Sequence, residues 1–185
     1  KNKKLIIGII IGGIIASSIT VYAYSYLASD ISYTKDETEM SVEGASFPIS
    51  DEKQLIWFNQ ITADRNNNCF RYAIDLDGSC VGMIGFHAID YRNSTAHVDI
   101  KILSHCRGQG IGTRAMALLI SYAFNELNLH CLIAEILENN LASREMHEKA
   151  GFQLDGILRN RIYKGGIYHN QCIYSVLKKE YNVKK

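Results

Sequence analysis

The feature that most constrains the fold of this chain is a glycine-rich segment between a predicted strand and a predicted helix, Arg107-Gly108-Gln109-Gly110-Ile111-Gly112-Thr113. The strand before it is expected over residues 96–103. The helix after it is expected because apolar residues recur at helical spacing: Ile111, Ala115, Leu118, Leu119, Tyr122 and Leu127. A strand that turns directly into an amphipathic helix is typical of a mixed α/β domain.

The residue types of this segment also suggest a chemistry. Glycines let the backbone turn tightly and approach a ligand closely, and a helix N-terminus offers free N–H donors to an anion. Arg107 adds donors suited to phosphate oxygens. A Walker loop is excluded because no Gly-Lys-Ser/Thr follows, and the dinucleotide fingerprint fails at Thr113, where its third glycine is expected. We predict a pyrophosphate-binding loop, with an ordinary glycine-rich turn as the alternative.

Alternation and turn signals predict the rest of the domain. The expected strands span residues 70–76, 80–89, 96–103, 131–137, 156–163 and 168–177. Asp77-Gly78 is a strong type I′ hairpin signal, and Gly165-Gly166 joins the last two strands. Helices are expected from near Asp51, from Ile111, and over 141–150, the last ending at Gly151. The predicted fold is α/β (α+β), a mostly antiparallel sheet flanked by helices with a central β-loop-α-β unit.

The N-terminus has a different character from the rest. A basic start, Lys1-Asn2-Lys3-Lys4, precedes an almost unbroken apolar run from Leu5 to Ala23. This pattern predicts, over residues 1–29, a signal peptide cleaved after Ala23 or an uncleaved membrane anchor, since about 19 residues can just span a bilayer. A buried helix is the third alternative. Residues 30–46 are polar and acidic and read as a linker, and residues 47–181 form the predicted domain.

Composition limits the partners and the compartment. Twenty basic and 19 acidic residues give a net charge of +1, which does not support a broad nucleic-acid-binding face. Five cysteines without a C-x-x-C pair indicate neither a disulfide framework nor a zinc site, so no metal is expected. Free cysteines are typical of reducing compartments such as the cytoplasm, whereas the N-terminus predicts export or anchoring. The sequence therefore leaves the localisation open between the cytoplasm and export or membrane anchoring.

Three motifs in order carry a family resemblance: the Arg107-Gly-x-Gly-x-Gly loop, then Glu135-x4-Asn140-x2-Ser143, then Glu148-Lys149-Ala150-Gly151-Phe152. Over residues 47–181 the chain resembles the GNAT superfamily of acetyl-CoA-dependent N-acetyltransferases. Gly156-x2-Arg159, Gly166-x-Tyr168 and Leu177-x2-Glu180-Tyr181 are similar to the ribosomal-protein N-terminal, spermidine and amino-sugar acetyltransferase branches. The resemblance implies that the N-terminal apolar segment replaces the front strand and helices of that family.

The resemblance implies a cofactor site for acetyl-CoA. The glycine-rich loop would hold the pyrophosphate, the 100–103 backbone would pair with the pantetheine arm, and two residues near the second helix would flank that arm. The implied cofactor-binding residues are Ile102, Leu103, Arg107, Gly108, Gln109, Gly110, Ile111, Gly112, Thr113, Asn140 and Ser143.

The resemblance also implies direct attack of a neutral amine on the thioester, which asks for a base and an acid. Glu135 matches the position of a glutamate base, and a structural salt bridge is its alternative reading. His147 stands where the family usually has a tyrosine acid. It either acts as the acid or packs at the helix end while Tyr163 or Tyr168 serves instead. His97 is a weaker candidate, and Cys106 reads as a bystander.

The predicted function is therefore transfer of acetyl from acetyl-CoA to a primary amine, which could belong to a protein N-terminus, a polyamine or an amino sugar. No nucleic-acid partner is expected, and membrane contact would run through residues 5–23. The alternative is an exported or membrane-tethered module that keeps the fold and has lost transfer activity. A nucleotide-sugar or dinucleotide binder is disfavoured by Thr113.

Overall fold

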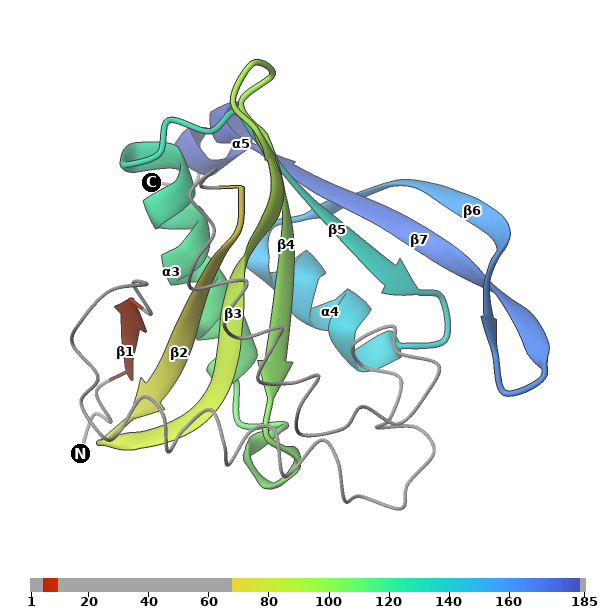
Figure 1. Cartoon of the computed structure of the whole chain (residues 1–185), viewed down its shortest axis with the longest axis horizontal. Coiled ribbons are helices and arrows are strands. Elements are labelled where there is room, and N and C mark those ends of the chain that lie inside the picture. Colours follow the sequence, from red (N-terminus) through yellow and green to blue (C-terminus); the bar gives the residue numbers. More distant parts are fainter. Residues whose placement is uncertain (1–4, 10–67, 184–185) are drawn as a thin grey trace.

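The computed structural model of the protein describes residues 5–9 and 68–183. In this part of the chain seven strands form one sheet in the order β1-β2-β3-β4-β5-β7-β6. The strands are β1 (Leu5–Ile9), β2 (Phe70–Leu76), β3 (Ser79–Asp90), β4 (Thr95–Ile102), β5 (Cys131–Leu137), β6 (Gln153–Lys164) and β7 (Ile167–Leu177). The helices are a short 3-10 turn η1 (Ser104–Cys106), then α3 (Ile111–Asn125), α4 (Leu141–Ala150) and α5 (Lys178–Val183). The mixed, mostly antiparallel architecture predicted from the sequence is confirmed (Figure 1).

One strand pair organises the middle of the sheet. β4 and β5 run parallel, and their register pairs are Thr95 with Cys131, Ala96 with Leu132 and His97 with Ile133. β4 continues to Ile102 and β5 to Leu137, so the two strands part beyond His97 (Figure 1). The loop and α3 connect them, which is the predicted β-loop-α-β unit. Beyond His97, the edge of β4 is left without β5 as a partner.

The core lies between one face of the sheet and the helices. α3 packs on β3, β4 and α4, and α4 packs on β5. Alternate strand residues point into this layer, among them Ile74, Phe86, Leu132 and Tyr174, all fully buried. The intervening residues of each strand therefore face the other side of the sheet. That second face carries the polar side chains described below.

The buried stripe of α3 differs in part from the predicted one. Ile111, Ala115 and Leu119 are buried as expected, but Leu118 is 45% exposed. The stripe instead continues through Met116, Ile120, Ala123 and Phe124. At about 100° per residue, Leu118 falls on the flank of this stripe, outside the contact with the sheet.

The N-terminal apolar run begins as a strand. Leu5–Ile9 forms β1, which pairs antiparallel with the edge of β2 from Leu5↔Leu76 to Ile9↔Tyr72. These five residues therefore lie at the edge of the sheet. Isoleucine-rich sequence suits a strand, and the pairing supplies partners for the backbone.

The other N-terminal predictions are not tested. Among the described residues, no helix combines the length and the apolar character needed to cross a bilayer. The cleavage site after Ala23, the linker over 30–46 and the helix predicted from Asp51 lie outside the described residues. The signal, the anchor and the localisation therefore stay predictions.

Two glycines of β3 are required by the sheet itself. A Cβ added at Gly85 would collide with the carbonyl oxygen of Phe70 on the neighbouring strand and lie 2.9 Å from Arg71 Nη1. A Cβ at Gly82 would collide with the carbonyl oxygen of Lys101. Only residues without a Cβ allow β2, β3 and β4 to pack this closely.

Gly85→Ala is therefore expected to destabilise the protein. Overpacking against a backbone carbonyl that cannot move freely should lower the free energy of unfolding by about 1–3 kcal/mol. Chemical denaturation measures the change. Gly156→Ala on β6 is the matched control, because an added Cβ there meets no described heavy atom within 4 Å. Equal stability of the two variants would contradict the packing argument.

Candidate functional site

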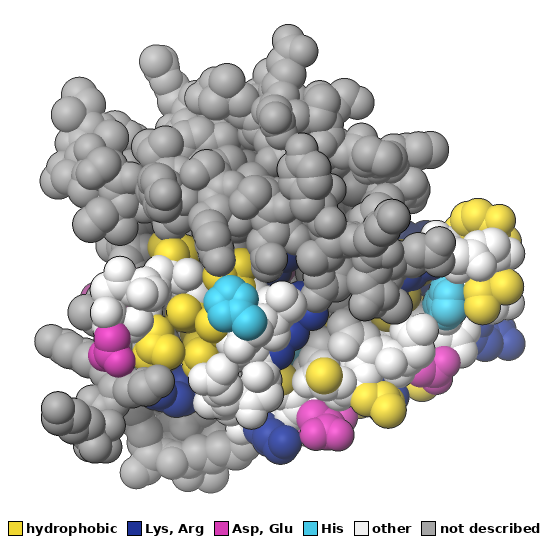
Figure 2. All heavy atoms as spheres, turned by 90° about the horizontal axis from the view of Figure 1, so that it is seen from below, with side chains coloured by type: hydrophobic (Ala, Val, Ile, Leu, Met, Phe, Trp, Pro, Cys, Tyr) yellow, Lys and Arg dark blue, Asp and Glu magenta, His cyan; other side chains and the backbone are white. Residues whose placement is uncertain are grey.

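The glycine-rich loop lies where β4 ends and α3 begins. Gly108 and Gly110 have φ angles of +74° and +73°, left-handed values that suit glycine, and Gly110 caps α3. A Cβ built on either would meet no described heavy atom within 4 Å, so no described residue fills this side of the loop. Seen from this end, a histidine side chain lies beside white atoms, which are backbone or other polar side chains, with basic and hydrophobic side chains next to them (Figure 2). The predicted tight turn is confirmed.

The N-terminus of α3 is available to an anion. The Arg114 N–H donates to the Gly110 carbonyl at 3.2 Å, which is the first backbone bond of the helix. The preceding N–H groups, of Ile111, Gly112 and Thr113, have no earlier carbonyl within the helix to bond. No acidic side chain lies in this first turn, and no side chain caps it. An uncapped end of a 15-residue helix beside open glycines fits a pyrophosphate group.

The other loop residues brace it. Arg107 Nε donates to the Ile102 carbonyl at 3.0 Å, and Gln109 Nε2 donates to the His105 carbonyl at 3.2 Å. Gly112 has a different role, because a Cβ there would touch Met146 Cγ at 3.5 Å. Arg107 thus ties the loop to the end of β4, and Gly112 faces α4, where an added Cβ would make an ordinary van der Waals contact.

The end of β4 borders the gap between β4 and β5. Leu103 is buried, and its N–H donates to the Val81 carbonyl at 3.0 Å, toward β3. Ile102 is half-buried and pairs with Gly82 on that same side. The opposite edge faces the gap, where an extended arm can add as a strand would.

Asn140 and Ser143 have a visible structural role. Asn140 is the N-cap of α4, and its Oδ1 accepts the Ser143 N–H at 3.2 Å. This is the usual way a polar residue satisfies the start of a helix. Contact of these two residues with a cofactor stays a prediction.

Glu135 lies on β5, just past the point where β4 and β5 part. Its Oε1 is 3.4 Å from His97 Nδ1, and its Oε2 accepts the Gln171 Nε2–H at 2.9 Å. The side chain is still 44% exposed. The sequence offered two alternatives for Glu135, a structural salt bridge and a catalytic base. The observed carboxylate has the partners of the first and the accessibility that the second requires. The sequence did not indicate Gln171, although its place in an alternating strand was the available signal.

His147 is 3% exposed, at the end of α4. Its Nδ1 lies 2.8 Å from the Ser143 carbonyl oxygen, which can only accept, so the proton is on Nδ1. The ring packs edge-on against Phe152 with centroids 5.1 Å apart. Nε2 is buried and has no hydrogen-bond partner among the described residues. Burial lowers the pKa of this imidazole, although the Ser143 bond opposes the shift.

A neutral ring with its proton on Nδ1 has none to give from Nε2. The geometry of His147 therefore favours the packing alternative over the acid. Tyr163 and Tyr168, the other candidates for the acid, flank the β6–β7 hairpin turn and are 60% and 63% exposed, and their role stays a prediction. That hairpin extends away from the helices (Figure 1). Cys106 lies in η1, and the described residues contain no cluster of His, Cys, Asp and Glu arranged for a metal ion.

The lowered pKa of His147 predicts a stability change with pH. The unfolded chain takes up this proton near pH 6.5, whereas the folded chain resists it, so stability should fall as pH drops through about 6.5. In His147→Phe this fall should be smaller. Urea unfolding at about pH 7.5 and about pH 5.5 compares them, with exposed His130→Asn as the control. An unchanged pH dependence in His147→Phe would contradict the buried neutral ring.

The chain belongs to the acetyltransferase (GNAT) family, whose domain model matches residues 24–153. The match begins before Phe47, so it includes the residues 30–46 that the sequence suggested as a linker. The open loop at the start of α3 and the parting of β4 and β5 both lie inside the matched range.

Curated relatives agree with this family. The chain is 38% identical over 109 residues to the Bacillus subtilis protein named "Putative ribosomal N-acetyltransferase YdaF", covering 59% of this chain and 60% of that protein. It is 29% identical over 107 residues to the Escherichia coli spermidine N(1)-acetyltransferase, covering 56% and 58%. The chain thus spans about three fifths of the length of these relatives.

Solved structures share the fold. A probable acetyltransferase is 30% identical and superposes with a TM-score of 0.73, covering 86% of this chain and 89% of that one. The Vibrio cholerae spermidine N-acetyltransferase in complex with CoA and spermine has a TM-score of 0.76 at 16% identity, covering 97% and 98%. The second likeness concerns the fold alone. No comparison supports the alternative of an inactive binding module.

Proposed function

We propose that this chain is an acetyl-CoA-dependent N-acetyltransferase that acetylates a primary amine. One arrangement carries the proposal: an open, uncapped helix N-terminus lies at one end of the gap between β4 and β5, and an exposed carboxylate lies where that gap begins. The names of the relatives, which include ribosomal and spermidine acetyltransferases, support the same reaction class.

The chain's own residues would hold acetyl-CoA along this gap. The loop from Gly108 to Thr113 would take the pyrophosphate on backbone N–H groups, and the open edge of β4 would bind the extended arm. The thioester would then lie near Glu135, at the narrow end of the gap.

The transfer would be direct. Glu135 accepts a proton from the substrate ammonium, and the neutral amine nitrogen forms a bond to the thioester carbonyl carbon. The carbon–sulfur bond breaks, the electron pair leaves with the sulfur, and the nitrogen, which carries two protons after the attack, gives one of them to solvent and keeps the other in the amide. The thiolate takes a proton from solvent or from an acid of the site. His147 is not proposed as that acid, because its Nε2 is buried and carries no proton in the neutral ring.

A thermal melt of the protein with and without acetyl-CoA tests the cofactor site first. Ligand at about a hundredfold over its dissociation constant should add roughly 2.7 kcal/mol of stability. Transfer is then assayed by release of free CoA thiol with three amines: an N-terminal peptide, spermidine and an amino sugar. A folded protein whose melt does not shift, or which acetylates none of the amines, would overturn the proposal.

A further inference from the structure

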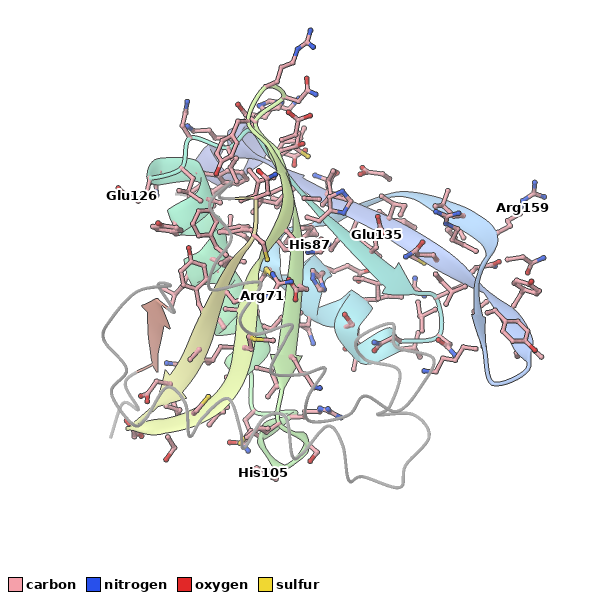
Figure 3. The ribbon with its side chains drawn as sticks, viewed as in Figure 1. Arg71, His87, His105, Glu126, Glu135 and Arg159 are labelled. Atoms are coloured by element: carbon pink, nitrogen blue, oxygen red, sulfur yellow. The ribbon has the colours of Figure 1, made fainter. Side chains whose placement is uncertain are left out.

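A row of polar side chains crosses the sheet on the face away from α3 and α4. Its members come from five strands and occupy positions that alternate with buried core residues. We call this set the polar row; it consists of Arg71, His87, Asp99, His97, Glu135 and Gln171. Figure 3 shows Arg71, His87 and Glu135 following one another from β2 toward β5.

Contacts link each member of the polar row to the next. Arg71 Nη1 is 2.9 Å from Asp99 Oδ1, and the same oxygen is 3.4 Å from His87 Nδ1. The rings of His87 and His97 have centroids 5.4 Å apart. His97 then contacts Glu135, which Gln171 contacts from the other side.

Gly85 makes the far end of the row possible. In the sheet register it lies between Arg71 and Asp99, and it has no side chain to separate them. An added Cβ would lie 2.9 Å from Arg71 Nη1. The Arg71 guanidinium, which also donates to the Phe86 carbonyl at 2.9 Å, can therefore cross β3 and reach Asp99.

The near end of the row lies where β4 and β5 part. His97 is paired with Ile133, the last register pair of these two strands, and Glu135 is two residues further along β5. The contact between His97 and Glu135 is thus diagonal and bridges the mouth of the gap. Gln171 reaches the same carboxylate from β7, on the opposite side of β5.

We propose that His97 and Gln171 are positioning residues that hold the two oxygens of Glu135 toward the acceptor amine. This inference rests on the proposed function, in which Glu135 is the base. Gln171 donates an N–H to Oε2, and His97 places Nδ1 beside Oε1. A half-exposed glutamate without these contacts would sample several rotamers, and most of them would misplace its oxygens.

The rest of the row fixes His97. The His87 ring lies against the His97 ring, and Asp99, held by Arg71, lies beside His87. The loss of kcat on substitution should therefore be largest at His97, smaller at His87 and smallest at Asp99. If the row only stabilised the fold, the order would be reversed. Arg71, 12% exposed, is its most buried charge, so removal of its partner Asp99 should lower the stability, and with it the activity, most.

Steady-state kinetics of the whole chain test the positioning role. His97→Leu and Gln171→Leu should each lower kcat about tenfold to a hundredfold, since small misplacements of a reacting group cost that much. The KM for acetyl-CoA should not change, because the loop at α3 is untouched. His97→Asn should restore part of kcat, because its amide can place an N–H near the position of Nδ1.

The matched control is Gln153→Leu on β6. It removes a similar glutamine–glutamate bond, from Gln153 Nε2 to Glu180 Oε1 at 3.1 Å, on the edge strand β6, which β7 separates from β5. Its kcat should equal that of the unchanged protein. Thermal melts of all variants show whether lost activity follows lost stability.

The outcomes separate the two proposals. If the unchanged protein transfers acetyl but His97→Leu and Gln171→Leu keep its kcat, the positioning role is overturned and the proposed function stands. Losses of kcat that follow the melting temperature, with Asp99→Asn worst, would also overturn it. If the unchanged protein acetylates no amine, the proposed function fails and the positioning role fails with it.

Discussion

Glu135→Gln should lower kcat for acetyl transfer by about 10²–10⁴-fold, the usual contribution of a positioned general base. Glutamine keeps the shape of the side chain and can still bond Gln171, but its amide cannot accept the proton of the ammonium. The change is in the proton acceptor and not in the packing, because the side chain is 44% exposed. Initial rates of CoA release measure the effect.

The affinity for acetyl-CoA should stay nearly unchanged in this variant. Glu135 points to the sheet face away from α3, whereas the predicted pyrophosphate loop opens at the start of α3. Isothermal titration with acetyl-CoA tests this. Glu145→Gln is the matched control, since it removes the same charge from an exposed position on α4 where Glu145 pairs with Lys149. Turnover of Glu135→Gln equal to that of the control would remove Glu135 from the mechanism.

The local elements were predictable because strong short-range signals define them. Asp77 and Gly78 both adopt the positive φ angles that a type I′ turn requires, and the strands on either side follow from it. The apolar run 131–137 and the helix 141–150 were predicted with their observed ends, and Gly151 marks the end of that helix. Leu118 was wrongly assigned because helical spacing alone does not fix the centre of a buried stripe.

The candidate site was predictable only where its parts are close in sequence. The glycine-rich loop is one continuous segment, and its left-handed residues were visible as glycines. The contacts of Glu135 depend instead on the order of strands: Gln171 follows it by 36 residues, and β7 lies beside β5 only in the folded sheet. The protonation of His147 depends on burial by its surroundings, which the residue type alone does not indicate.

Gly110→Val is expected to weaken acetyl-CoA binding on the order of 100-fold, which corresponds to about 2.7 kcal/mol. Two effects act together. A β-branched residue strongly disfavours the φ of +73° that Gly110 adopts, and its side chain would occupy the open space where the pyrophosphate is predicted to lie. Isothermal titration with acetyl-CoA measures the loss.

Two further variants separate these effects. Gly110→Asn adds a side chain of similar size, but asparagine tolerates left-handed geometry, so any loss of binding would come chiefly from the filled space. Gly165→Val makes the strained substitution at the β6–β7 turn, where φ is +56° and an added Cβ also meets no described atom within 4 Å. It should lower stability and leave binding unchanged. If Gly110→Asn and Gly110→Val both bound acetyl-CoA as tightly as the unchanged protein, the loop would not be the cofactor site, since a pyrophosphate bonded to the N–H groups of α3 has to pass over Gly110.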